Sequence, residues 1–283
     1  MTGTGRWVTL ADEPGLADQN EAAESDGPVF LAELTAAQRE QLTRAHPAEQ
    51  WLYVVDSRVV AVVRGLALAW DGTSAGAPSS GVGGAMALAG TGQADTLAVL
   101  DLTVAPDVRG SGLGRHLLAE LDVLRGRSGL ERLLLLARPH AKHRHPLVPF
   151  ARYVTATDDD GRPHDGWLAA VWAAGFHPVL GVDRSLVARA PVAVWERWYG
   201  RPFPTSGPYL LPGAIKPAIV EYEVDEGRYR EPHLWMAPRE HLAQRTVDPA
   251  ALRVPRDAWR RALAAAGLIA GSRRHREVRR ELG

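Results

Sequence analysis

Cysteine is absent from the 283 residues of this chain. That absence excludes disulfide bonds, thiolate metal ligands and a cysteine nucleophile. The sequence also has no apolar run near the ~20 residues that cross a membrane. Its start, MTGTGRWVTLADEPG, lacks the basic residues and the apolar core of a secretory signal. We therefore expect a cytoplasmic protein that has no membrane partner.

The chain also has no net charge, because 33 basic residues balance 33 acidic ones. Chains that hold nucleic acid usually carry a basic excess or stripe. Only residues 272–282, SRRHREVRREL, are locally basic, and Glu277 and Glu281 dilute their charge. We interpret this segment as a solvated helix end, so no nucleic-acid partner is expected. Apolar residues make up 46% of the chain, which is enough for a sizeable core.

The first seventy residues contain three recognisable elements. Residues 6–11, RWVTLA, predict a short strand, and residues 35–45, TAAQREQLTRA, predict a helix that Thr35 can cap. Residues 51–70 hold two β-branched runs on either side of Asp56-Ser57. Two such runs around a short polar turn are typical of a β-hairpin.

Residues 71–96, DGTSAGAPSSGVGGAMALAGTGQADT, are mostly small and offer little to bury. We interpret this segment as a flexible surface loop. The alternative is a mobile flap over a site, because long loops in compact domains are often functional.

A strand–helix–strand unit follows. Residues 96–105, TLAVLDLTVA, and 130–139, LERLLLLARP, are nearly continuous apolar runs, as expected of strands that are buried on both faces. Between them a leucine stripe has helical spacing: Leu113, Leu117, Leu118, Leu121 and Leu124. This order predicts a βαβ unit whose two strands are parallel.

The rest of the chain alternates between helical and extended patterns. Residues 165–176 predict a helix that Gly175 ends, and residues 177–189 predict a strand. Further on, the pattern predicts a helix with core aromatic residues over 190–200, strands over 219–236 that turn at Asp225-Glu226-Gly227, and a helix over 254–271 with Pro255 near its start. We expect the last ninety or so residues to form an extension.

Three glycines, Gly110, Gly112 and Gly114, join the first strand of the βαβ unit to its helix. Free N–H groups at a helix N-terminus attract anions, and glycine lets a phosphate approach the backbone. A P-loop requires a lysine after the glycines, and a dinucleotide-binding fold has the spacing G-x-G-x-x-G at its first βα turn. Neither pattern fits this stretch.

The pattern Arg109-x-x-Gly112-x-Gly114, which follows Val104-Ala105-Pro106, resembles the coenzyme A signature of the GNAT acyltransferase superfamily. The AAGF at 173–176 is similar to the Gly-Phe that ends a later helix in that family. The resemblance covers roughly residues 6 to 189. A finer resemblance, to large bacterial GNAT-like proteins with a C-terminal extension, comes from the segments 137–153, 160–168 and 206–217.

This resemblance implies an α/β GNAT fold, with a mixed central β-sheet flanked by helices. It places an acyl-CoA-binding domain at residues 1–189, and a smaller α+β extension at 190–283 that packs on or near the acceptor cleft. It also implies an N-acyltransferase that moves an acetyl group from acetyl-CoA, or another acyl group from its CoA thioester, to a small-molecule amine without a covalent intermediate. The alternatives are a weakly active or inactive acyl-CoA-binding module and an enzyme that uses a carrier-protein thioester. A homodimer is left open.

The resemblance also assigns the residues that would hold the cofactor. In the family a β-bulge on the strand before the glycines splays this strand from its neighbour, and one N–H there polarises the thioester. The backbone of Leu102, Thr103 and Val104 would follow the pantetheine arm. The pyrophosphate would lie on the loop that follows: Arg109, Gly110, Ser111, Gly112, Leu113, Gly114 and Arg115.

For the catalytic base, Asp101 is the first candidate because it is the only carboxylate on the central strand. Strand alternation places Asp101 and Thr103 on one face, but the sequence does not say which face is open. His143 and His145 are alternatives, because an imidazole titrates near neutral pH.

The family's usual acid, a tyrosine about four residues before the Gly-Phe, corresponds to Val171 here. Tyr153 is the candidate substitute. A packed aromatic residue is an equally acceptable interpretation of Tyr153. His140 occupies the place where the family often has an asparagine. The histidines at 140, 143, 145 and 164 lack an acidic partner pattern, so we expect no metal site.

Overall fold

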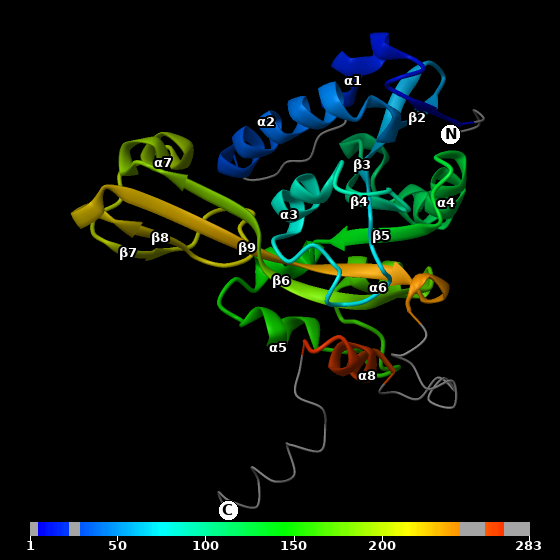
Figure 1. Cartoon of the computed structure of the whole chain (residues 1–283). Helices are drawn as coiled ribbons and strands as arrows, with labels where there is room; N and C mark the ends of the chain where they lie inside the picture. Colours follow the sequence, from blue (N-terminus) through cyan, green and yellow to red (C-terminus); the bar gives the residue numbers. More distant parts are fainter. Residues whose placement is uncertain (1–4, 23–28, 244–257, 269–283) are drawn as a thin grey trace, which may run out of the picture.

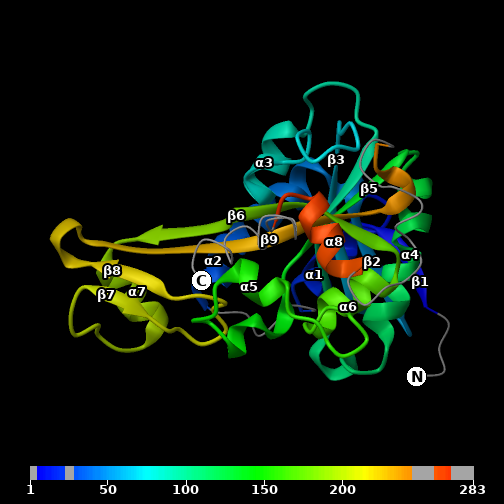
Figure 2. The same cartoon turned by 90° about the horizontal axis from the view of Figure 1, so that it is seen from below.

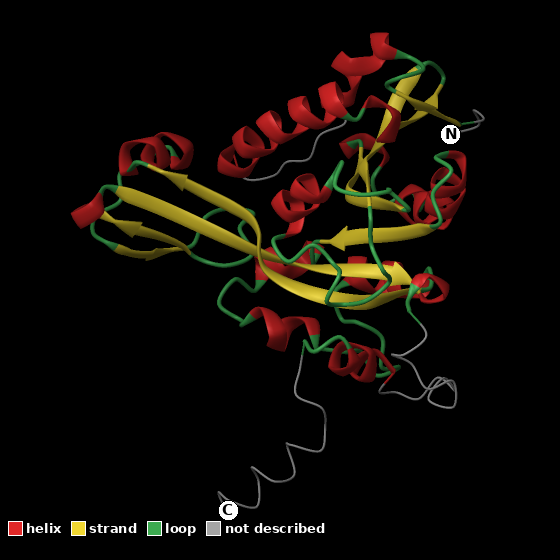
Figure 3. Ribbon diagram, in the orientation of Figure 1, coloured by secondary structure: helices red, strands yellow, loops and turns green. Residues whose placement is uncertain are grey.

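The computed structural model describes residues 5–22, 29–243 and 258–268 (Figure 1). Within them, nine strands form one mixed sheet with the order β1-β2-β3-β4-β5-β9-β8-β7, and β6 pairs with β9. Helices cover both faces of this sheet (Figures 1 and 3). The α/β class and the mixed, helix-flanked sheet predicted from the sequence are therefore confirmed.

The N-terminal part of the sheet is an antiparallel meander of β1 (Arg6–Thr9), β2 (Gln50–Val55), β3 (Arg58–Leu68) and β4 (Thr96–Val104). The predicted hairpin is confirmed: Asp56 and Ser57 join β2 to β3 with positive φ angles of 48° and 63°. Such angles match a tight hairpin turn, in which Asp is tolerated better than most residues.

Two helices lie between β1 and β2: α1 (Ala17–Ala22) and α2 (Val29–Ala45). The predicted helix over 35–45 exists, but it begins at Val29, so Thr35 lies inside it and does not cap its start. Short 3-10 helices complete the connections: Pro14–Leu16, Pro47–Glu49, Pro106–Val108, His140–Arg144, Tyr222–Val224 and Arg239–His241.

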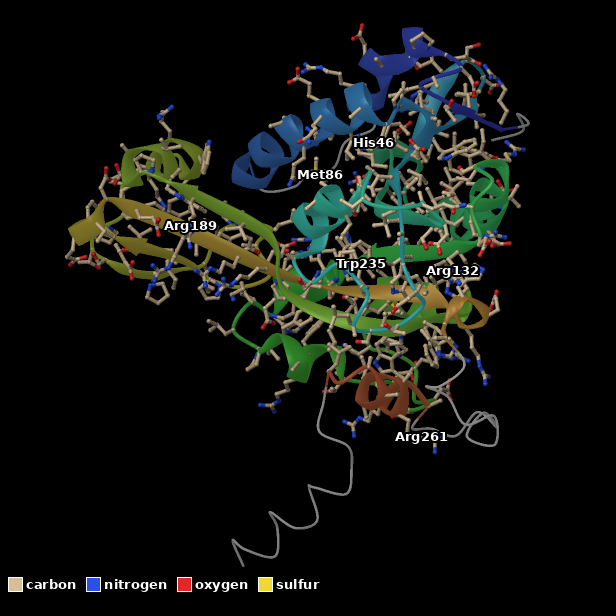
Figure 4. All side chains as sticks on the ribbon, in the orientation of Figure 1. His46, Met86, Arg132, Arg189, Trp235 and Arg261 are labelled. Carbon is tan, nitrogen blue, oxygen red and sulfur yellow. The ribbon has the colours of Figure 1, made fainter. Side chains whose placement is uncertain are left out.

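The segment 71–96, expected to be a flexible loop, instead contains the helix α3 (Gly81–Leu88). Its small residues fit because Val82 and Ala85 are buried against the sheet, together with Leu66, Leu134 and Trp235. Trp235 Nε1 donates a hydrogen bond of 2.8 Å to Pro78 O. Figure 4 shows Met86 of this helix above the sheet near Trp235. A run of small residues therefore permitted close packing here, and the prediction of an unstructured loop was wrong.

The predicted βαβ unit is confirmed. The helix α4 (Leu113–Arg127) connects β4 to β5 (Arg132–Ala137), and the two strands are parallel. Of the leucine stripe of α4, Leu118, Leu121 and Leu124 are buried in a core cluster to which α6 (Gly166–Ala173) and α8 (Ala258–Ala265) also contribute. The start of the predicted 254–271 helix, with Pro255, lies outside the described residues, as does the basic segment 272–282. One face of the sheet thus carries α4, α6 and α8, and the other carries α2 and α3.

The boundary predicted at residue 189 does not separate two units. The strand β6 (Phe176–Ala190) pairs with β9 (Glu226–Pro238), and β9 also pairs with β5 through Leu234, Trp235 and Met236. The strand β9 therefore lies between β5 and β6 in the central sheet, although the sequence prediction placed it in the extension. Because the extension and the sheet share this strand, residues 191–225 are better described as an insertion at the tip of a long hairpin.

This insertion contains α7 (Val192–Tyr199), β7 (Gly207–Tyr209) and β8 (Ala218–Glu221). It extends the β6–β9 hairpin as an arm away from the central sheet (Figure 2). The predicted core role of the α7 aromatics is confirmed for Trp195, which is fully buried and donates a 2.7 Å hydrogen bond to Gly227 O. Glycine is required at 227, because a Cβ there would overlap the Trp195 ring.

Candidate active site

The glycine loop forms an open N-terminus on α4. Gly112 precedes the helix in the left-handed conformation, with φ 89°, and Gly110 has φ 78°. Both angles favour glycine over any residue with a Cβ. A Cβ at either position would meet no atom within 4 Å, so the space in front of the loop is open.

The N-cap residue has no side chain to cap the helix. Leu113 N–H donates a 3.4 Å hydrogen bond to Ser111 Oγ and Arg115 N–H one of 3.1 Å to Gly112 O. The N–H groups of Gly112 and Gly114 make no hydrogen bond to a described residue, so they are available to an anion.

Two side chains brace this loop from behind. Arg109 Nε donates a 2.9 Å hydrogen bond to Val104 O, and Ser111 Oγ donates one of 2.7 Å to Val108 O. The first of these contacts ties the Arg109 side chain to the end of β4.

The strands β4 and β5 separate directly before the loop. They pair from Thr96–Arg132 to Val99–Leu135 and no further. At the same level the register between β3 and β4 shifts, and Leu100 is the extra residue of a β-bulge. A bulge bends and twists the strand that carries it. We call the diverging ends of the two strands the β4–β5 splay. The bulge and splay that the family resemblance implied are present.

On the β4 side of the splay, Leu102, Thr103 and Val104 pair with β3 only, among the residues that the structure describes. Their other backbone edge faces the splay. An extended chain bound there would find N–H and C=O groups in the positions that a neighbouring strand would otherwise use.

Asp101 lies at this edge and forms an ion pair. Its Oδ2 accepts 2.7 Å hydrogen bonds from Arg64 Nη1 and from Thr103 Oγ1. The Arg64 side chain is buried, whereas that of Asp101 is 47% exposed. Asp101 therefore faces open space with its charge supported from behind by Arg64. An ionised carboxylate in such a position is chemically suited to accept a proton.

On the β5 side, Arg138 follows the last strand residue and contacts the completely buried Glu231. Arg138 Nε and Nη2 donate to the two carboxylate oxygens at 2.5 and 3.2 Å, and Nη2 also donates to Gly213 O at 2.9 Å. Burial alone would raise the pKa of Glu231, but the charge of Arg138 and a hydrogen bond from His233 outweigh it and lower this pKa. Glu231 is therefore a permanent anion at neutral pH.

Three further side chains complete the cluster around Glu231. Tyr229 Oη donates to Oε2 at 2.5 Å, and His233 Nε2 donates to Oε1 at 2.8 Å. The other ring nitrogen of His233, Nδ1, makes a 2.9 Å hydrogen bond with the hydroxyl of Ser185. Ser185 lies in an irregular part of β6, where the register with β9 shifts between Val182 and Leu186. Both carboxylate oxygens of Glu231 and both ring nitrogens of His233 are thus paired.

The Tyr153 hydroxyl faces the protein interior. It donates a 3.0 Å hydrogen bond to Asp165 Oδ2, and Asp165 also accepts from the N–H groups of Ala141, Trp167 and Leu168. Burial, and then the charge of Asp165, raise the pKa of Tyr153 well above its usual range. A phenol that holds its proton this tightly is a poor acid, so its surroundings do not support the predicted catalytic role.

Lys142 is buried beside Tyr153, with its Nζ 5.5 Å from the centre of the tyrosine ring. Its ammonium group donates to two main-chain oxygens, of His145 at 2.7 Å and of Ile215 at 2.8 Å. Burial, and to a smaller extent the charge of Lys216, lower the pKa of Lys142 to about 8. Lys142 therefore ties the histidine-rich connection to the insertion.

The predicted histidines follow β5 but do not gather into a site. His143 Nδ1 donates to His140 O at 2.9 Å, and the exposed His145 ring lies 6.0 Å from the ring of Tyr153. Neither makes a hydrogen bond or ion pair with Asp101 in the described part of the chain. No three histidine or carboxylate side chains there are arranged to hold a metal ion. Val171, at the position of the family's acid, is fully buried.

Comparison with known families agrees with this geometry. Residues 17–152, which contain the glycine loop, the bulge and both splayed strands, match the model of the Acetyltransferase (GNAT) family. This region belongs to the GNAT family. No helix in the described part of this GNAT protein has the length and apolar character needed to cross a membrane.

Similar proteins include an arginine N-acetyltransferase from Aspergillus versicolor, which is 29% identical over 158 residues. This match covers 50% of the chain and 54% of that enzyme, so the chain spans about half the length of this relative. Among solved structures, the GphF GNAT-like decarboxylase in complex with isobutyryl-CoA has a TM-score of 0.47 at 18% identity, covering 65% of this chain and 90% of that one. The loading GNATL domain of CurA from Lyngbya majuscula has a TM-score of 0.43 at 16% identity, covering 63% and 86%.

Sequence analysis of this GNAT chain missed the cluster around Glu231. Arg138, Glu231 and His233 lie at the end of one apolar strand and within another, and nothing in their spacing marks them as partners. A signal existed in the run REPHLWM, where Glu231 and His233 alternate with apolar residues. Both side chains are therefore on one face of a strand that is buried on both sides.

Proposed function

We propose that this GNAT protein is an acyl-CoA-dependent N-acyltransferase that moves an acetyl group from acetyl-CoA to a small-molecule amine. The observation that carries the proposal is the β4–β5 splay, with an unpaired strand edge that leads to an open glycine loop. A pantetheine arm can lie along this edge while the pyrophosphate rests on the N-terminus of α4. The similarity to an arginine N-acetyltransferase supports an amine acceptor.

In this mechanism the acceptor's ammonium group first gives one proton to water. The neutral amine then attacks the thioester carbonyl carbon, and its nitrogen passes a second proton to Asp101. The C–N bond forms, the C–S bond breaks, and the electron pair of that bond leaves with the thiolate of coenzyme A. Asp101 suits the role of base because it pairs with the buried Arg64 and about half of its side chain is exposed. Backbone N–H groups near the bulge would stabilise the developing oxyanion, an effect commonly worth a few kcal/mol.

No acid needs to assist the departure of the thiolate, because a thiol is a moderately strong acid, with a pKa near 8.5 in the free side chain of cysteine. The thiolate can take its proton from water. This agrees with the position of Tyr153, whose proton is committed to Asp165.

Binding and turnover test the proposal separately. Acetyl-CoA should raise the melting temperature of the protein, and a panel of amines should release free coenzyme A thiol. Asp101→Asn should lower kcat by about 10²- to 10⁴-fold, the usual contribution of general acid–base catalysis, and should leave the Kd of acetyl-CoA unchanged. The exposed Asp159→Asn is the control and should leave both quantities unchanged.

The alternatives give other results. Stabilisation by acetyl-CoA without turnover of any amine would favour a binding module. Turnover only with a carrier-bound thioester would favour an enzyme that uses a carrier-protein thioester. If no acyl-CoA stabilises the protein, the proposal is wrong.

A further inference from the structure

Two groups of opposite charge lie on the same face of the sheet, one at each side of the β4–β5 splay. On β5, Leu134 and Leu136 contribute to the core cluster under α3, and Arg138 continues their alternation. On β3, Leu66 and Leu68 belong to the same cluster, and Arg64 continues that alternation and binds Asp101. Because side chains two apart on a strand share a face, Arg138 and Asp101 are both on the α3 side of the sheet.

The two groups also lie at a similar height along the strands. The last β4–β5 pair is Val99–Leu135. Asp101 follows Val99 by two residues, one of them the bulge, and Arg138 follows Leu135 by three. A strand rises ~3.3 Å per residue, and paired strands lie ~4.8 Å apart. Both charges are therefore within about 10 Å of the last pair, and they are separated by more than the normal spacing of two strands.

Each side chain makes its hydrogen bonds through some of its polar atoms and has one polar atom without a hydrogen bond to a described residue. Asp101 uses Oδ2 for its hydrogen bonds, and within the described residues Oδ1 accepts none. Arg138 uses Nε and Nη2, and Nη1 makes no hydrogen bond to any described residue. The side chain of Asp101 is 47% exposed and that of Arg138 is 30% exposed.

The buried cluster fixes the direction of the Arg138 guanidinium. Burial of the Glu231 carboxylate is costly, and only a full set of donors compensates for it. Arg138, Tyr229 and His233 supply these donors, and the two hydrogen bonds from Arg138 prevent its guanidinium from turning. The pairing leaves 30% of the Arg138 side chain exposed, so the guanidinium can still meet a second anion.

We infer that the acceptor is a free α-amino acid. Its carboxylate pairs with Arg138, and its amine lies against Asp101. This inference rests on the proposed function and names the substrate class of that site. A free amino acid has an ammonium group and a carboxylate group bonded to the same carbon atom. With one hydrogen bond at each end, it can bridge two side chains that are farther apart than neighbouring strands. Arg138 thereby positions the amine next to the base, and a second charge on the acceptor becomes part of its recognition.

Steady-state kinetics with matched acceptors tests this inference. The wild-type protein is assayed with acetyl-CoA and the twenty free amino acids, and the best substrate is compared with its own primary amide and with the amine that lacks the carboxyl group. The amide keeps the amine and the side chain but loses the negative charge. A charge-assisted hydrogen bond in a partly buried place supports a preference of about ten- to a hundredfold. We expect kcat/KM for the acid to exceed that for the amide by this factor, mostly through KM.

The double variant Arg138→Gln/Glu231→Gln assigns the preference to this pair. It removes both charges and retains two side chains that can hydrogen-bond each other, which protects the fold. The preference for the acid should fall to within about threefold, while the rise in melting temperature caused by acetyl-CoA stays as in the wild type. The single variant Arg138→Lys keeps a positive charge at this position, so it should show part of the preference that the double variant loses. A matched control is Arg228→Gln/Glu221→Gln, a two-bonded pair in the hairpin arm, which should leave the preference intact.

The outcomes separate the two ideas. Equal use of acid and amide by an active wild-type protein overturns the inference and leaves the proposed function standing. A preference for the acid that survives the double variant also overturns it. If acetyl-CoA neither stabilises the protein nor supports turnover of any acceptor, both the inference and the proposed function are wrong.

Discussion

The two sides of the β4–β5 splay are assembled from very different stretches of the chain. The β4 side, its bulge and its glycine loop come from one run of residues, 99–115. On the β5 side, Arg138 is held by Gly213, which is 75 residues away, and by Glu231, which is 93 residues away. The proposed cofactor side is therefore encoded locally, whereas the proposed acceptor side depends on the whole β6–β9 hairpin and its insertion.

The two sides also differ in what holds their charges. Asp101 is half-exposed, and water shares in its stabilisation. Glu231 is completely buried and depends on its protein partners alone. Replacing the acid by its amide should therefore lower the free energy of unfolding only slightly at Asp101 and strongly at Glu231.

The largest effect on stability is expected for Glu231→Gln. Removing one partner of a buried ion pair usually costs about 3–5 kcal/mol. Asp101→Asn should cost less than about 1 kcal/mol, because its ion pair is half-exposed. Urea denaturation of the two variants against the wild type measures both changes. Similar losses in the two variants would contradict the difference between the two sides.

The wild type and the Glu231→Gln variant should also differ in how their free energy of unfolding changes at acidic pH. The folded pKa of Glu231 lies below its unfolded value, which is near 4.3. Its contribution to stability is thus complete above that unfolded value and is lost as the pH falls towards the folded pKa. Between pH 5 and pH 3 the wild type should lose free energy of unfolding faster than Glu231→Gln.

The local side was predictable and the long-range side was not. The pattern of Arg109, Gly112 and Gly114 after an apolar strand was enough to predict the loop, and the family resemblance added the bulge. Asp101 was also selected as a candidate from the sequence, because the only carboxylate on a central strand is visible there, and its role as base stays a prediction. The partner of Arg138 could not be found, since a buried ion pair between two strands leaves no pattern of spacing. Tyr153 was given a catalytic role for the same reason: its partner Asp165 caps a helix, and that contact appears only in the fold.

The order of the last strands was hidden in a similar way. Alternation predicted β6 and β9 as strands, but it carries no information on which neighbours they take. The placement of β9 between β5 and β6 makes the chain after residue 190 return to the central sheet. The boundary predicted after residue 189 is therefore the start of an insertion.

A second test concerns Lys142, which ties the connection after β5 to the insertion. Its folded pKa of about 8 is lower than that of a free lysine, near 10.4. The folded protein thus releases this proton at a lower pH than the unfolded chain does, and stability rises with pH between these two values. From pH 7 to pH 10 the wild type should gain roughly 2–3 kcal/mol relative to Lys142→Met. Chemical denaturation at a series of pH values measures this gain.

Lys216→Met is the control for that series. The charge of Lys216 is the smaller of the two causes that lower the pKa of Lys142, and burial is the larger. The variant should therefore keep most of the rise with pH. If Lys142→Met shows the same rise as the wild type, Lys142 is not the group that titrates.

Smaller effects on stability than those at Glu231 and Lys142 are expected in the glycine loop, on the local side. Gly112 has φ 89°, so Gly112→Ala should cost about 1–2 kcal/mol through backbone strain. Gly114 lies within the helix, where alanine is preferred over glycine by about 0.5–1 kcal/mol, and a Cβ there would make only ordinary contacts, at 3.9 Å or more. Gly114→Ala should therefore raise stability slightly. Both variants should weaken acetyl-CoA binding at least about tenfold, because each places a Cβ beside the N–H groups of the loop.

A third alanine variant distinguishes an effect on the loop from an effect on the helix. Gly126 belongs to the last turn of α4, and a Cβ there would meet nothing within 4 Å. Gly126→Ala should raise stability by a similar amount and leave the Kd of acetyl-CoA unchanged, as measured by calorimetry. The three variants then differ in strain and in position but share the same added methyl group. If Gly114→Ala binds acetyl-CoA as tightly as Gly126→Ala does, the pyrophosphate does not rest on this loop, and the proposed cofactor side of the splay would have to be assigned elsewhere.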